Sequence, residues 1–263
     1  MNSKFGEQLS PLAKRFALCV RELAEPRKSI GIDLCQDQKF PAASVIKAGI
    51  MSCLLCDVHE GRLSLEDPVE LKEEHVVGGA GVLFELGRQH SFRLDELCRL
   101  MMVVSDNTAS NACLRAVGMD RLNDFFRKRG YGANVQRFFM NPVVDGRDNT
   151  MSAESAVLMM ADIYNGLGLS ESLKDFAIGC LRRQQYREKI PLLLPEKVVV
   201  GHKTGELLGV RHDAAVVETD QPYLIAIFTS EGGAPWSVDR AMAEVSLDVF
   251  DFMTSSRVQG CQV

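Results

Sequence analysis

The chain has 263 residues, of which 46% are hydrophobic and 25% are charged, and its formal net charge is −5 at pH 7. This composition is typical of a globular protein that buries a sizeable core. No block of Lys and Arg stands out, which argues against nucleic acid as a partner. No stretch approaches the roughly 18 apolar residues that a membrane span requires.

The N-terminus lacks the continuous apolar segment of a secretory signal, because Gly6, Glu7 and Gln8 interrupt it. We therefore expect the protein to be cytoplasmic as written, and periplasmic or secreted only if a leader was removed. The eight cysteines are scattered through apolar surroundings, which is typical of reduced thiols in a core. Cys53 and Cys56 form a C-x-x-C pair inside a helical stripe, and we interpret them as small core residues, not as a zinc or redox site.

In chain order, residues 9–25 have apolar side chains at helical spacing and predict an amphipathic helix that Pro26 ends. Residues 29–34 alternate weakly and predict a short strand. From Ser44 to about residue 187, helical periodicity dominates, interrupted by turns. The glycine cluster at residues 77–82 predicts a flexible loop, and it lacks the Gly-Lys-Ser/Thr ending of a phosphate-binding loop. Predicted helices after this loop span residues 94–104, 108–117, 121–129 and 153–166.

The C-terminal part changes character. β-branched or apolar runs separated by short polar turns predict an antiparallel meander. These runs cover residues 197–204, 213–218 and 223–229, and a helix at 238–253 follows. Because strands stand at both ends of the chain and helices fill its middle, we predict an α/β (α+β) fold, in which an antiparallel sheet is flanked by N- and C-terminal helices. We expect one domain over residues 1–263, with an α/β layer from 1–43 and 188–263 and an inserted all-helical subdomain over 44–187.

Ser44 and Lys47 lie three residues apart at the mouth of the first apolar helix of the middle region. Residues at this spacing share a helix face. A partly desolvated lysine there can take the serine proton, and N–H groups at a helix start can hold an oxyanion, so the pair suits acyl transfer. The alternative is an N-cap serine followed by a solvated lysine.

Two further motifs follow, Ser105-Asp106-Asn107 at the end of a predicted helix and Lys203-Thr204-Gly205 on a predicted strand. Alone, the first could be a helix end and turn, and the second the end of a surface strand. Together and in this order, the three motifs resemble those of the class A β-lactamases and the wider penicillin-recognising serine hydrolases, S-x-x-K, S-D-N and K-T-G. The resemblance extends from about residue 39 to the C-terminus.

This resemblance implies catalytic roles. Ser44 would be the acylated nucleophile, and Lys47 its proton acceptor or a source of electric field. Ser105 would relay a proton to the leaving nitrogen, close to the cation Lys203. The backbone N–H groups of Ser44 and Glu206 would form the oxyanion hole, where one donor is commonly worth about 3 kcal/mol.

The resemblance also implies binding roles. Asn107 would orient the lysine of the first motif and contact a substrate amide. Thr204 and Gly205 would bind the substrate carboxylate and allow its close approach. Arg211 or His212 falls where such enzymes often keep a carboxylate-binding cation, although a histidine beside an aspartate is commonly a structural pair.

This sequence differs from the class A enzymes at one of their motifs. Their loop motif E-x-x-L-N supplies a glutamate that activates the deacylating water, and the matching residues 141–145 place Asn141 at the glutamate and Asp145 at the asparagine. An amide cannot act as a general base at neutral pH. Asp145 could have become the base, deacylation could be slow as in a penicillin-binding protein, or the substrate could be an ester or peptide amide released through Lys47 alone.

We therefore predict a serine hydrolase that acts through an acyl-Ser44 intermediate on a β-lactam or a related amide or ester bearing a carboxylate. The resemblance implies no metal or organic cofactor, a small-molecule substrate, and a monomer. The alternatives are a peptidase, an esterase or a penicillin-binding-type protein with slow deacylation, an idle binding protein that keeps the cleft, or an interaction protein that uses the fold as a scaffold.

Overall fold

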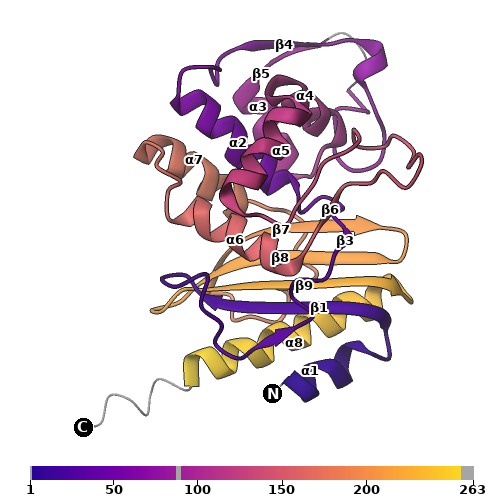
Figure 1. Cartoon of the computed structure of the whole chain (residues 1–263), viewed down its shortest axis with the longest axis vertical. Helices are drawn as coiled ribbons and strands as arrows, with labels where there is room; N and C mark the ends of the chain where they lie inside the picture. Colours follow the sequence, from indigo (N-terminus) through magenta and orange to yellow (C-terminus); the bar gives the residue numbers. More distant parts are fainter. Residues whose placement is uncertain (1, 87–89, 256–263) are drawn as a thin grey trace.

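The computed structural model describes residues 2–86 and 90–255, and it is built around a five-stranded antiparallel sheet in the order β2-β1-β9-β8-β7 (Figure 1). The three C-terminal strands are joined in sequence, and β1 pairs with β9 over most of its length. The strands are β1 (Ala13–Glu22), β2 (Asp33–Leu34), β7 (Val199–Leu207), β8 (Val210–Glu218) and β9 (Tyr223–Gly232). The predicted antiparallel α+β fold is confirmed.

Each face of the sheet has its own hydrophobic core, as alternation of side chains along a strand requires. In β9, Leu224, Ala226 and Phe228 belong to the core shared with the central helices. Tyr223, Ile225 and Ile227 face the other core, which contains residues of α1 (Asn2–Leu9) and α8 (Pro235–Ser255). The terminal helices thus cover one face together.

The predicted helix at residues 9–25 is wrong, because most of this segment is β1. Its central residues Ala17, Leu18, Cys19 and Val20 are fully buried between the two cores. A strand covered on both faces is a continuous apolar run, and periodicity alone does not distinguish such a run from a helix. The helix that precedes it, α1, ends at Leu9.

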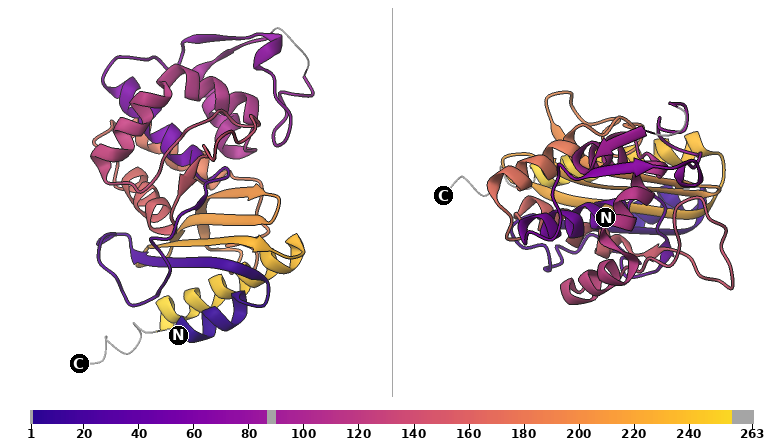
Figure 2. Two further views of the ribbon diagram at one scale, coloured as in Figure 1. Left: turned by 45° about the vertical axis from the view of Figure 1, so that its right-hand side comes forward. Right: turned by 90° about the horizontal axis from the view of Figure 1, so that it is seen from above.

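The segment between β3 (Phe40–Pro41) and β7 forms the other half of the molecule, at the β7 edge of the sheet (Figure 2). It also holds a hairpin of β4 (Pro68–Leu71) and β5 (His90–Arg93), a short 3₁₀ helix η1 (Glu73–His75), and β6 (Thr150–Met151) paired with β3; the hairpin and α7 were not predicted. Its helices are α2 (Lys47–His59), α3 (Leu94–Val103), α4 (Asn107–Val117), α5 (Met119–Arg129), α6 (Ala153–Tyr164) and α7 (Glu171–Arg182).

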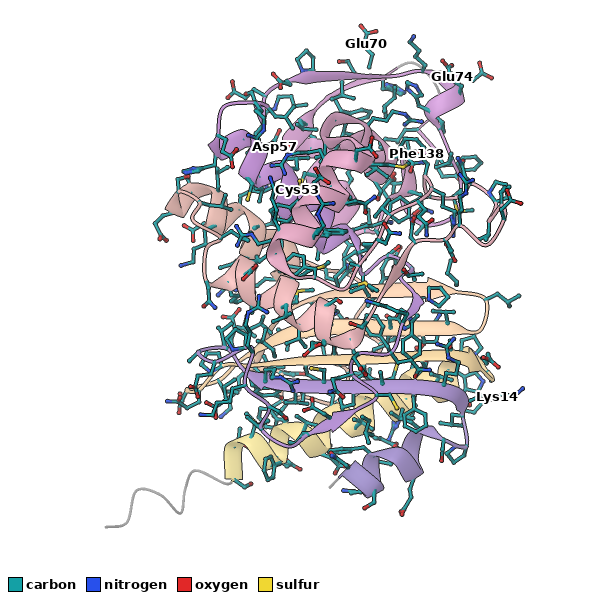
Figure 3. All side chains as sticks on the ribbon, viewed as in Figure 1. Lys14, Cys53, Asp57, Glu70, Glu74 and Phe138 are labelled. Atoms are coloured by element: carbon teal, nitrogen blue, oxygen red, sulfur yellow. The ribbon has the colours of Figure 1, made fainter. Side chains whose placement is uncertain are left out.

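Cys53 and Cys56 are buried on α2, within the core shared by the helices and the sheet (Figure 3). Their placement agrees with the interpretation as core residues, whereas Cys35 is exposed and Cys261 lies outside the described residues. Within residues 2–86 and 90–255, no helix is long and apolar enough to cross a membrane.

Candidate active site

Ser44 lies in a tight turn that leads into α2, not in the helix itself. The amide of Lys47, the first helical residue, donates to the Ser44 carbonyl at 3.2 Å. The preceding residue, Ala43, has a φ of +46°, a conformation that costs energy for a residue with a side chain and that is common at functional sites. Ser44 is half-buried and lines two neighbouring cavities of about 270 and 180 Å³.

The edge strand β7 approaches this turn closely at Gly205. A Cβ on Gly205 would lie 3.1 Å from the Ser44 nitrogen and from the Ala43 Cβ, so a larger residue would push the strand away. Leu207 and Val210 flank the two-residue hairpin loop and form the hydrogen-bonded pair expected there. By alternation, the N–H of Glu206 points away from β8, to the free edge of the sheet where Ser44 lies.

A chain of polar contacts links two buried lysines through one serine. Lys47 Nζ donates to the Ser105 carbonyl oxygen at 2.7 Å, to Ser105 Oγ at 3.1 Å and to Asn107 Oδ1 at 2.9 Å. Lys203 Nζ contacts the same Ser105 Oγ at 3.1 Å, and it donates to the carbonyl oxygen of Thr204 at 2.8 Å. The three sequence motifs therefore meet at the Ser105 hydroxyl.

Both lysines are fully buried, and this changes their protonation. Burial, together with the nearby charge of Lys203, lowers the pKa of Lys47 well below its usual value. Burial lowers the pKa of Lys203 to about 7. Two amines with lowered pKa values thus flank a hydroxyl that can pass a proton between them.

Asp106, the middle residue of the second motif, holds the glycine cluster in place. Its carboxylate caps α4 by accepting from Ala109, and its other oxygen accepts from the amides of Val82 and Leu83. A Cβ on Gly81 would lie 2.4 Å from the Asp106 Cα, so the loop can pack here only without a side chain. The segment predicted as a flexible loop is therefore pinned to the motif, and its residues 79 and 80 line the larger cavity.

The structure does not bring Asp145 to Ser44. Asp145 is exposed at the tip of a turn closed by the bridge between Val144 and Arg147, and it lines neither cavity. The residue of this loop that reaches the lysine is Phe139, whose ring centroid lies 4.6 Å from Lys47 Nζ. The expectation that Asp145 serves as the base thus has no geometric support, since a base must lie within hydrogen-bond reach of its water.

Comparison with known proteins agrees with this geometry. The sequence profile of the beta-lactamase enzyme family matches residues 4–253. This chain belongs to that family. The curated relative beta-lactamase CARB-3 of Pseudomonas aeruginosa is 26% identical over 229 residues, which cover 83% of this chain and 79% of the relative.

Several solved structures superpose over nearly the whole chain. A beta-lactamase from Sphaerobacter thermophilus aligns with a TM-score of 0.87 and 23% identity over 95% of each chain. PBP-A aligns with a TM-score of 0.85 and 26% identity over 97% of this chain and 96% of its own. A mutant of PBP-A was determined as an acyl-enzyme complex with penicillin G and aligns at 25% identity and a TM-score of 0.85 over 97% of this chain and 96% of its own.

Two expected site residues of this beta-lactamase family member are engaged elsewhere. His212 is fully buried, stacks on Phe228 with ring centroids 4.1 Å apart, and donates from Nε2 to the Pro41 carbonyl oxygen at 2.9 Å. Burial lowers the pKa of His212 to about 4, so its ring is neutral at pH 7. Arg211 is held by Asp239 and Glu206. Neither is a free cation for a substrate carboxylate.

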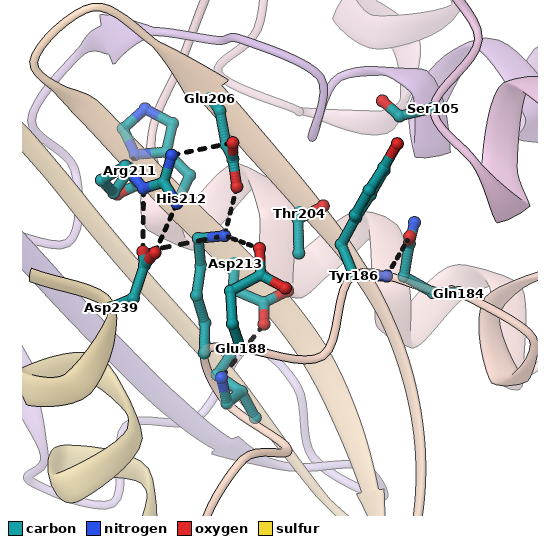
Figure 4. Close-up of polar contacts among 12 residues, drawn as sticks. Ser105, Gln184, Tyr186, Glu188, Thr204, Glu206, Arg211, His212, Asp213 and Asp239 are labelled. Atoms are coloured by element: carbon teal, nitrogen blue, oxygen red, sulfur yellow. Dashed lines mark hydrogen bonds and ion pairs between the residues drawn. The ribbon is translucent and has the colours of Figure 1, made fainter. Parts of the chain in front are cut away.

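Several residues that line the cavities beside Ser44 were not predicted from the sequence. Tyr186, in the segment between α7 and β7, lines the smaller cavity together with Thr204 (Figure 4). Arg137 and Asp148 form a salt bridge at 2.7 Å across the base of the loop and line the larger cavity. In the sequence, their opposite charges on either side of a loop were the feature that could have identified them as a pair. No group of three or more His, Cys, Asp or Glu within the described ranges is placed to hold a metal ion.

Proposed function

We propose that this protein is a serine hydrolase that forms an acyl-enzyme on Ser44 with a β-lactam or a related ester or amide. The observation that carries the proposal is the chain from Lys47 Nζ through Ser105 Oγ to Lys203 Nζ, beside the cavities that Ser44 lines. The acyl-enzyme that a mutant of PBP-A forms with penicillin G supports it.

In the proposed reaction, Ser44 Oγ bonds to the substrate carbonyl carbon, and the bond from that carbon to the leaving nitrogen or oxygen breaks. The Ser44 proton passes to neutral Lys47. Ser105 then delivers its own proton to the leaving atom and takes one from the protonated Lys47, which lies 3.1 Å from Ser105 Oγ. Lys203 keeps the Ser105 hydroxyl oriented from the opposite side. The developing oxyanion would be held by the N–H groups of Ser44 and Glu206, which converge because β7 approaches the turn at Gly205.

Release of the acyl group is proposed to be slow. Phe139 is buried beside Lys47, and the amide side chain of Asn111 on α4 clamps it, accepting from its N–H at 2.8 Å and donating to its carbonyl at 3.1 Å. An apolar ring thus occupies the position next to the lysine from which a base would have to activate water. Of the three routes left open by the sequence, slow deacylation has the strongest support.

Mixing the protein with penicillin G should add the mass of the intact drug to Ser44 within minutes. The adduct should last longer than the time needed to form it, and intact-protein mass spectrometry measures both times. Ser44→Ala removes the nucleophile and should abolish the adduct. An adduct that survives in Ser44→Ala would refute the acyl-transfer proposal. No adduct in the native protein would exclude penicillin G as a substrate and leave the ester and amide substrates to be tested.

Asp145→Asn should leave the rates of acylation and release unchanged within about twofold, because the side chain is exposed and remote from the cavities. Stopped-flow acylation and the decay of the mass adduct measure the two rates. Loss of release with intact acylation would restore Asp145 as the base.

Thr204, which the resemblance assigns to the substrate carboxylate, lines the smaller cavity. The finer expectations of a monomer and of a cytoplasmic location stay predictions from the sequence.

A further inference from the structure

A salt-bridge cluster borders the Ser44 site on the side of β7, and it carries an excess of negative charge. Lys189 is fully buried, and its Nζ lies 2.8 Å from Glu188, 2.5 Å from Glu206 and 3.7 Å from Asp239. Figure 4 labels the three carboxylates. Arg211 contacts Glu206 at 2.8 Å and also pairs with Asp239. Two cations therefore face three carboxylates.

Glu206 is the member of this cluster that lines both cavities. Its side chain is 42% exposed, and its carboxylate oxygens pair with Lys189 and Arg211. Burial works against ionisation, but Lys189 and Arg211 prevail and hold the pKa of Glu206 below its usual value. An ionised carboxylate thus stands next to Thr204, where a carboxylate of the substrate was expected to bind.

The two cavities differ in what they would hold during acyl transfer. The smaller one, lined by Ser44, Ala80, Ser105, Tyr186, Thr204 and Glu206, contains the hydroxyl that would protonate the leaving atom, and we call it the leaving-group cavity. The larger cavity contains Phe139, Met140 and Leu207 and suits an apolar acyl group. Glu206 therefore faces the leaving group in the smaller cavity.

We propose that Glu206 is a specificity-determining residue that makes the leaving-group cavity disfavour a carboxylate and favour a neutral group or an ammonium group. The inference rests on the proposed acyl transfer at Ser44. A substrate carboxylate beside Thr204 would meet the like charge of Glu206. Lys189 and Arg211 are already shared among three carboxylates, and Lys203 already donates to Ser105 Oγ and to the Thr204 carbonyl oxygen. An ammonium group at the same place would gain a charged hydrogen bond to Glu206.

Three esters of phenylacetic acid test this inference, because they share the acyl group and differ in the charge of the leaving phenol. The phenols are 3-hydroxybenzoate, 3-hydroxybenzamide and 3-(aminomethyl)phenol. The second-order rate of Ser44 acylation is measured from the burst of phenol. In the native protein the amide and ammonium esters should react about tenfold faster than the carboxylate ester, once each rate is divided by the rate of base hydrolysis.

Glu206→Gln keeps the shape of the side chain and removes its charge, so it should abolish the preference and raise the rate of the carboxylate ester about tenfold. Glu188→Gln is the matched control, because Glu188 pairs with the same lysine but lines neither cavity. It should leave the order of the three esters unchanged. Melting temperatures of both variants verify that they fold.

A native preference for the carboxylate ester, or equal changes in the two variants, would overturn the role of Glu206 while leaving acyl transfer intact. If none of the three esters and no penicillin G modified Ser44, the acyl-transfer proposal would fail and this inference would fall with it. The two failures are therefore distinguishable in one set of measurements.

Discussion

Phe139→Glu is expected to speed release of the acyl group from Ser44 by about 10²-fold, turning a long-lived adduct into turnover, since a positioned general base commonly contributes 10²–10⁴-fold. The backbone of residue 139 is clamped by Asn111, so a glutamate there keeps its side chain beside Lys47, whose Nζ lies 4.6 Å from the present ring. A carboxylate at this point can accept a proton from water that attacks the acyl-enzyme.

The matched control is Phe139→Gln, which has the length of glutamate but cannot act as a base at neutral pH. Both variants lose the same buried ring and its contact with the lysine, so any shared loss of stability cancels in the comparison. The decay of the penicillin G adduct, followed by mass spectrometry, gives the rate of release. If the two variants released the acyl group equally fast, the position would not be that of the base, and the slow step would have another cause.

Lys47→Met should reduce the rate of Ser44 acylation by about 10³-fold, because methionine has a similar length but no proton acceptor. Since a lysine accepts a proton only when it is neutral, native acylation should slow as the pH falls through the lowered pKa of Lys47. This decrease of the acylation rate at low pH should be absent from the residual activity of the variant. The rate of penicillin G acylation, measured across pH, tests both expectations.

Ser105→Ala is the companion variant, because it interrupts the contacts between the two lysines but leaves Lys47 and Asn107 in place. It should slow acylation but retain the decrease of the acylation rate at low pH, since the base is still present. An unchanged pH profile in Lys47→Met would contradict the assignment of the base and point to a different proton acceptor for Ser44.

The sequence predicted the residues that meet at the site better than the loops around them. The seven motif residues that were assigned roles are brought together with Glu206, because each motif is short and keeps its internal spacing. Those residues are Ser44, Lys47, Ser105, Asn107, Lys203, Thr204, Gly205 and Glu206. The strands of the C-terminal meander were recognised because each is bounded by polar turns.

The residue beside Lys47 was not identified from the sequence, and the reason is physical. Counting along a loop assumes its length, and the loop between Arg137 and Asp148 provides no periodicity that could fix which residue points inward. An apolar residue such as Phe139 also gives no chemical signal of a site. The ion pair of Arg211 was not predicted, because a sequence does not reveal that Asp239, on α8, packs beside it.

The polar chain through Ser105 joins residues that are far apart in the sequence, and this makes penicillin labelling a reporter of folding. The contact of Ser105 with Lys47 spans 58 positions of the sequence, and its contact with Lys203 spans 98. The polar chain therefore connects the helical half with the edge of the sheet (Figure 1). A chain in which either half is unfolded has no competent nucleophile. Adduct formation in partial denaturant would therefore count native molecules, and it would separate loss of the tertiary assembly from melting of individual helices.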